Sequence, residues 1–173
     1  GDIYLVNPTN LTFSPYGNVG YTQLSAFKFV TAHPFINGGL ACFVALQSGS
    51  NKLTVHKITD VSHMPLADIT IAEPLFPTPF PTSFAVRMTF VPDGQTHGPA
   101  LYFCERVAPH GLYQYNSAGV FSFIQNIDTV NPSPSSNPST LITDYCDGVD
   151  PDVQGFEYSE HDETFYVSIG SNE

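Results

Sequence analysis

Basic residues are scarce in this sequence, and their scarcity excludes whole classes of partner. Only 5 of the 173 residues are Lys or Arg, against 16 Asp or Glu, which gives a formal net charge of −11. Proteins that bind DNA or RNA use Lys and Arg to neutralise phosphates, so we expect no nucleic-acid partner. An anionic membrane surface is disfavoured for the same reason, and no apolar run approaches the ~18 residues of a membrane span. We therefore expect a neutral or cationic partner.

The composition also excludes long helices. The chain has 15 Pro and 13 Gly, and both residues break helix interiors. Its 14 Phe and 9 Tyr belong instead to the residue types that favour strands. Hydrophobic residues make up 42% of the chain, which is enough for a folded core, and the length suggests a single domain over residues 1–173. The composition therefore predicts an all-β protein.

Only three cysteines occur, and an odd number fits a disulfide framework poorly. Cys42 and Cys104 lie within apolar strand patterns, where a free thiol behaves as a small buried hydrophobe. We expect both to be free, and one disulfide with one free thiol is the alternative.

A single sequon, Asn10-Leu11-Thr12, predicts N-glycosylation of Asn10 and favours an extracellular or secreted protein. The chain shows no signal peptide, so we expect either that none exists or that it was removed before residue 1.

Four short strands recur in the same order along the chain. They occupy repeats of about 24–72 and 84–125, where Phe, Tyr, Val and Leu runs are separated by turns such as Pro92-Asp-Gly94. A third repeat combines 154–173 with 1–14, because the last strand and turn continue into the first strand as though the chain were circular. This pattern predicts that Ile3–Val6 pairs with Phe165–Ile169, within one chain or between two.

The repeats predict three four-stranded blades of a β-propeller, one of them split between the N- and C-termini. Repeats of ~40–50 residues with four strands are typical of propeller blades, although a β-sandwich also has many short strands. Pro-rich segments at 73–82 and 131–139 would connect the blades. Three blades are too few for a ring, since propellers have about four to eight. We therefore expect half of a six-bladed ring, completed by a homodimer or by a second chain.

The unit Arg87-Met-Thr-Phe-Val-Pro-Asp-Gly94 followed by Ala100-Leu-Tyr-Phe-Cys-Glu105 resembles the repeats of six-bladed propellers of the SMP-30/gluconolactonase and NHL type. Gln154–Asp162 followed by Thr164–Ser168 resembles the same unit. For the lactonase-like members, the resemblance implies one divalent cation at the centre of the ring. Glu105 matches one of the acidic ligands, whereas Gln154 and Ile169 depart from the pattern.

A second candidate metal site is the densest acidic segment. Its carboxylates are those of Asp144, Asp147, Asp150 and Asp152. Ca²⁺ takes several oxygen ligands from a flexible loop, so calcium is the cofactor that we expect if a metal binds. The spacing is not that of an EF-hand, and a solvated loop without a metal is the alternative.

Candidate ligand-binding residues are Arg106, His110 and Tyr145. His110 follows Pro109 in a turn beside Glu105 and Arg106, where an imidazole can act as a general base. Glu105 and His110 are therefore the candidate catalytic pair. Tryptophan, the usual platform for a sugar ring, is absent, so Tyr would have to replace it.

Three functions fit these observations. The first is an extracellular propeller that binds a small molecule, a glycan or a protein. The second is a metal-dependent, lactonase-like hydrolase, and the third is a structural assembly unit. We favour the binding module, because only one ligand of the lactonase set is present.

Overall fold

A computed structural model describes residues 2–20, 24–47, 52–58, 66–70, 86–106, 110–127 and 152–170. Within these ranges the chain forms β-strands and one short 3-10 turn at Asn37–Gly39, so the prediction of an all-β protein is confirmed. No helix in the described ranges is long and apolar enough to cross a membrane.

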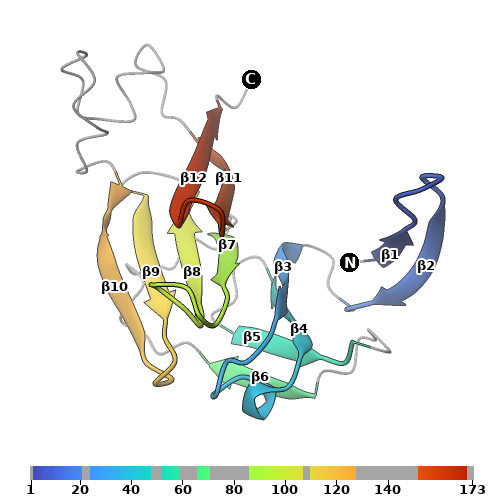
Figure 1. Ribbon diagram of the computed structural model, residues 1–173, viewed down its shortest axis with the longest axis horizontal. Helices are drawn as coiled ribbons and strands as arrows, with labels where there is room; N and C mark the ends of the chain where they lie inside the picture. Colours follow the sequence, from blue (N-terminus) through green and yellow to red (C-terminus); the bar gives the residue numbers. More distant parts are fainter. Residues whose placement is uncertain are drawn as a thin grey trace.

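Two antiparallel sheets contain four strands each, in the order of the sequence (Figure 1). Each corresponds to one of the predicted sets of four consecutive strands. The first sheet contains β3 (Leu24–Val30), β4 (Cys42–Gln47), β5 (Lys52–His56) and β6 (Ala67–Thr70). The second contains β7 (Val86–Val91), β8 (Ala100–Glu105), β9 (Gly111–Tyr115) and β10 (Phe121–Asn126).

The remaining strands form two separate hairpins. β11 (Asp152–Ser159) pairs with β12 (Thr164–Gly170), and β1 (Asp2–Val6) pairs with β2 (Phe13–Asn18). The prediction that β1 pairs with β12 is therefore wrong within one chain, and so is the single sheet predicted from 154–173 plus 1–14. The physical reason is that the β1–β2 hairpin stays beside the first sheet, where the Tyr16 ring meets Phe43 edge-on at 6.2 Å.

The second sheet is covered on both faces. Every residue of β8 is buried. Leu101 and Phe103 on one face pack with the first sheet, and Tyr102 and Cys104 on the other face pack with the β11–β12 hairpin. Successive residues of a strand point to opposite faces, so a strand buried on both sides reads as a continuous apolar run, as β8 does.

Phe103 on β8 belongs to the apolar core between the two large sheets. Its side chain is fully buried and meets the Phe121 ring at 5.6 Å in an edge-to-face arrangement. Truncation of such a residue to Ala costs roughly 3–5 kcal/mol of folding stability. The stack of sheets is therefore held mainly by apolar side chains between them.

The two large sheets and the β11–β12 hairpin, the third sheet of the stack, meet along their first strands. β7 lies against both β3 and β11. Figure 1 shows these strands near the centre of the molecule, with β10 and β6 farther out. Residues on β3, β7 and β11 can therefore contribute to one shared site.

Candidate ligand-binding groove

Two adjoining hollows open on the meeting line of β3, β7 and β11. Their volumes are about 480 Å³ and 310 Å³, and Lys28 and Glu157 line both. Small-molecule sites commonly occupy ~300–1,000 Å³, so the space suits a small ligand. We call the two hollows together the axial groove; its remaining polar lining includes Thr31, Arg87, Thr89, Gln154, Tyr158 and Glu160.

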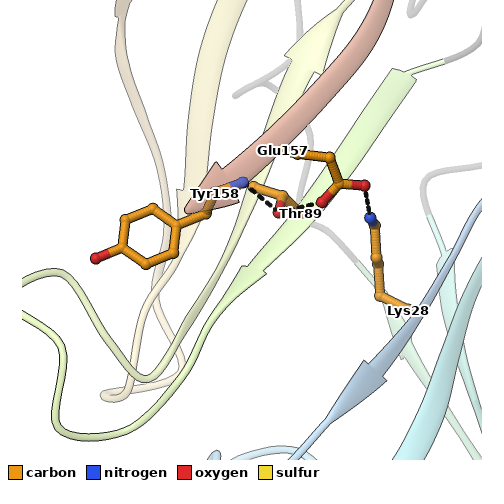
Figure 2. A network of polar contacts seen from close by, with 4 residues as sticks. All are labelled: Lys28, Thr89, Glu157 and Tyr158. Atoms are coloured by element: carbon orange, nitrogen blue, oxygen red, sulfur yellow. Dashed lines mark hydrogen bonds and ion pairs between the residues drawn. The ribbon is translucent and has the colours of Figure 1, made fainter. Parts of the chain in front are cut away.

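A polar network in the axial groove connects all three sheets (Figure 2). The Lys28 ammonium on β3 forms an ion pair with Glu157 Oε1 on β11. The Thr89 hydroxyl on β7 donates a hydrogen bond of 3.0 Å to Glu157 Oε2 and accepts one of 3.1 Å from the Tyr158 backbone N–H. Thr89 is buried, while Glu157 is largely exposed to the groove.

The charges of the axial groove balance. Lys28 and Arg87 supply two cations, and Glu157 and Glu160 supply two carboxylates. Two of the chain's five basic residues therefore lie here, in a protein of net charge −11. A balanced groove in an acidic protein favours a ligand without net charge over a free cation or anion.

Aromatic side chains stand beside these polar groups. Phe29, Phe90 and Tyr158 line the larger hollow, and Phe29 is 48% exposed. The Tyr158 hydroxyl donates to Gln95 Oε1 at 3.2 Å, which fixes the direction of its ring. Exposed rings beside hydroxyl, amide and charged groups can hold a ligand that has both apolar and hydrogen-bonding surfaces.

Sequence reasoning missed this network, although a signal was present. In each first strand a polar residue stands between two large apolar ones: Phe27-Lys28-Phe29, Met88-Thr89-Phe90 and Phe156-Glu157-Tyr158. A polar residue at the same position in three first strands, each time between two large apolar residues, marks a place where the three strands share a polar surface.

The structure brings Glu105 and His110 together, as the sequence suggested, but away from the axial groove. Both are buried, and His110 Nδ1 lies 3.3 Å from the Glu105 backbone oxygen. The Glu105 carboxylate accepts hydrogen bonds from the Gly111 backbone N–H at 3.0 Å and from the Tyr113 hydroxyl at 3.4 Å. The residues that line the axial groove do not include either of them.

Burial sets the protonation behaviour of Glu105. Loss of hydration raises the pKa of Glu105, and the hydrogen bonds from Gly111 and Tyr113 and the nearby His110 offset part of that rise. A Cβ on residue 111 would lie 2.7 Å from Glu105 Oε2, so glycine permits the close approach of the carboxylate to the start of β9. In this arrangement Glu105 and His110 hold the end of β8 beside the start of β9.

Several predicted site residues lie outside the described residues. These are Asp144, Tyr145, Asp147 and Asp150, together with the linkers 73–82 and 131–139.

Asp152 was expected in the same acidic loop, but its backbone belongs to β11 and pairs with Gly170. Arg106 lies at the end of β8, where its backbone oxygen accepts a hydrogen bond from Val153 N–H at 2.8 Å. Among the described residues, no three His, Cys, Asp or Glu side chains are grouped so that they could hold a metal.

Cys42 and Cys104 are free and buried, as predicted. Burial raises the pKa of the Cys42 thiol to about 11. Both side chains are therefore core residues, packed on opposite sides of the second sheet.

The sequon residue Asn10 lies in the exposed turn of the β1–β2 hairpin. Its Oδ1 accepts hydrogen bonds from the Thr12 backbone N–H at 3.1 Å and from the Thr12 hydroxyl at 2.8 Å. An exposed loop position is the kind of place at which an N-glycan can be attached.

No family model, no curated protein and no solved structure matches this chain.

Proposed function

We propose that this protein is an extracellular binding module whose axial groove takes a neutral, hydroxyl-rich ligand such as a sugar residue. The observation that carries the proposal is the balance of two cations and two carboxylates around a buried threonine. A sugar offers hydroxyl groups that both donate and accept, so it can bind to Lys28 and Glu157 at the same time.

The aromatic lining supports the same class of ligand. Sugar rings present apolar C–H faces, and Phe29 and Tyr158 offer ring surface in a chain without Trp. The exposed sequon at Asn10 is consistent with an extracellular setting. No contact in the described residues favours the hydrolase, because Glu105 is hydrogen-bonded to Gly111 and Tyr113 of β9 and does not line the groove.

The test is a screen of neutral oligosaccharides on an array, followed by calorimetric titration of the best ligand. Glu157→Gln removes the charge that pairs with Lys28, and Thr89→Val removes the hydroxyl that holds Glu157. We expect each change to weaken binding about tenfold or more, the effect of a lost hydrogen bond to a charged group. Asp93→Asn, in the exposed turn after β7, changes the charge equally and should leave binding unchanged.

Two outcomes would contradict the proposal. One is the absence of binding to any neutral glycan. The other is binding that Glu157→Gln and Thr89→Val leave unaffected, since the ligand would then bind elsewhere. Tighter binding of acidic glycans than of neutral ones would also contradict it, because it would show that Lys28 and Arg87 dominate the groove.

A further inference from the structure

Two strands of this protein, β1 and β12, each have an edge to which a further strand could add, because no described strand pairs with it. β1 pairs only with β2 and β12 only with β11 among the described strands, whereas the other two sheets have four strands each. An unpaired edge presents a row of free backbone N–H and C=O groups. A two-stranded hairpin by itself is also only marginally stable in water. The fold therefore contains two half-sheets, each with two strands fewer than the complete ones.

The β1–β2 hairpin resembles the two strands by which the β11–β12 hairpin falls short of a four-stranded sheet. In the second sheet, β9 and β10 are joined by a turn in which Asn116 Oδ1 accepts from Ala118 N–H at 2.9 Å. In the β1–β2 hairpin, Asn7 Oδ1 accepts from Thr9 N–H at the same distance. β1 thus corresponds to β9, and β2 to β10.

The two hairpins differ in burial. In β9, Tyr113 and Tyr115 are 2% and 8% exposed, but Tyr4 and Val6 at the corresponding positions of β1 are 53% and 50% exposed. The hairpin also exposes the side chains of Leu5, Leu11 and Phe13. Exposed apolar side chains gathered on one strand pair are typical of an interaction surface.

The position of the β1–β2 hairpin indicates whether it can pair with β12 of its own chain or only with β12 of a second copy. The first sheet and the β11–β12 hairpin pack against opposite faces of the second sheet. β1–β2 lies beyond the first sheet, with Tyr16 against Phe43, and Figure 1 shows it well separated from β12. The two half-sheets are therefore at opposite ends of the stack, and each faces outward.

We propose that the β1–β2 hairpin of one copy completes the β11–β12 sheet of a second copy, and that the exchange is reciprocal. One two-fold axis relates the two contacts, so both half-sheets of both copies are completed and all four edges are covered. Each completed sheet has the order β11-β12-β1-β2, which corresponds to β7-β8-β9-β10. Three sheets from each copy then give a six-sheet assembly.

The complete sheet also predicts the register of the exchange. Tyr158 pairs with Phe165 as Phe90 pairs with Leu101, so Phe165 corresponds to Leu101. Leu101 pairs with Tyr115 and Phe103 pairs with Tyr113 in the second sheet. By this correspondence, Val6 lies opposite Phe165 of the second copy and Tyr4 lies opposite its Val167.

The test is disulfide trapping with the double variant Tyr4→Cys/Val167→Cys in a Cys146→Ser background. Directly opposite residues on antiparallel strands have Cβ atoms ~4.5–5.5 Å apart, close enough for a disulfide to form with small adjustment. We expect mild oxidation to give a covalent species of twice 18.9 kDa on a non-reducing gel. Tyr4 is exposed, so its replacement should not disturb folding, and far-UV circular dichroism checks this.

Matched controls define the contact. Each single variant should stay at 18.9 kDa after oxidation, and so should Tyr4→Cys/Tyr166→Cys, because Tyr166 points to the other face of β12. Light scattering of the unmodified protein should give twice 18.9 kDa. A double variant that is oxidised only within its own chain would overturn the proposal in favour of closure by the same copy. A monomer in solution, or equal trapping by the off-register pair, would also overturn it.

Discussion

His33, in the loop after β3, stacks on Tyr115 of β9 with ring centroids 5.2 Å apart and planes within 4° of parallel. Its Nε2 lies 3.4 Å from the Tyr115 backbone oxygen, and the imidazole is fully buried. The contact joins the first sheet to the second. Burial lowers the pKa of His33 below 6.5, and hydrogen bonds to backbone groups oppose only part of that effect.

The buried imidazole predicts that stability falls in mild acid. In the unfolded chain His33 binds a proton below about pH 6.5, while the folded chain resists it, so the free energy of unfolding decreases as pH falls below that value. His33→Phe keeps a ring on Tyr115 and removes the titration. We expect the variant to lose less stability than the unmodified protein between pH 7 and pH 5, in urea titrations followed by fluorescence. Parallel losses in the two proteins would contradict this role of His33.

Glu105 predicts the opposite trend with pH. Its pKa is raised in the folded protein, so the folded state holds the proton at pH values where the unfolded state has lost it. Its contribution to stability is present below the unfolded pKa, ordinarily 4.5, and is lost as pH rises through the folded pKa. Glu105→Gln keeps an acceptor for Gly111 N–H and cannot ionise.

We therefore expect the stability of Glu105→Gln, relative to the unmodified protein, to improve as pH rises from 4 to 8. The gain should be ~1.4 kcal/mol for each unit by which the folded pKa exceeds the unfolded one. Urea titrations at each pH measure it, and Glu160→Gln serves as an exposed control. A constant difference between the two proteins across this range would show that the carboxyl is not perturbed.

The two buried cysteines predict a native protein with unreactive core thiols. With the pKa of Cys42 at about 11, only ~0.1% of that thiol is ionised at pH 8, and the thiolate is the reactive form. Cys104 is equally buried, and its Sγ–H points to the Glu105 backbone oxygen at 3.4 Å. In a Cys146→Ser variant we expect no thiol to react with an aromatic disulfide reagent within minutes. Two should react after denaturation, and rapid reaction of the folded protein would contradict the burial.

The sequence predicted strands well because the apolar runs and turns are local signals. Val120-Phe-Ser-Phe-Ile124 and its turn, for example, needed no knowledge of the rest of the chain to be read as a strand. The axial groove could not be predicted in the same way. Lys28, Thr89 and Glu157 are far apart in sequence and meet only because three first strands lie side by side.

The partner of β1 illustrates a second limit of local reasoning. The apolar run Ile3–Val6 predicts a strand, and the β1–β2 hairpin confirms that strand. The repeat pattern predicted that this strand pairs with Phe165–Ile169, but among the described strands of one chain β1 pairs only with β2. Pairing between strands so far apart in sequence depends on how the sheets pack and not on the residues of the strand alone.

Gly119 lies in the turn between β9 and β10, and its substitution tests how closely this turn packs against the first sheet. It has φ +73°, and a Cβ there would lie 2.7 Å from the Phe35 ring. Gly94, in the turn after β7, has φ +88° with nothing within 4 Å of the same atom. Alanine at a positive φ costs ~1–2 kcal/mol at either site, so only Gly119→Ala adds a steric contact with another sheet.

We therefore expect Gly119→Ala to reduce the free energy of unfolding by about 1 kcal/mol more than Gly94→Ala. The excess should disappear in a Phe35→Ala background, because the ring that collides with the new methyl group is then absent. Urea titrations of the four variants and the unmodified protein form a double-mutant cycle. Equal losses of stability at the two glycines would contradict this prediction. They would mean that the Phe35 ring, which is 57% exposed, rotates away without an energetic cost. This turn would then contribute little to the contact between the sheets.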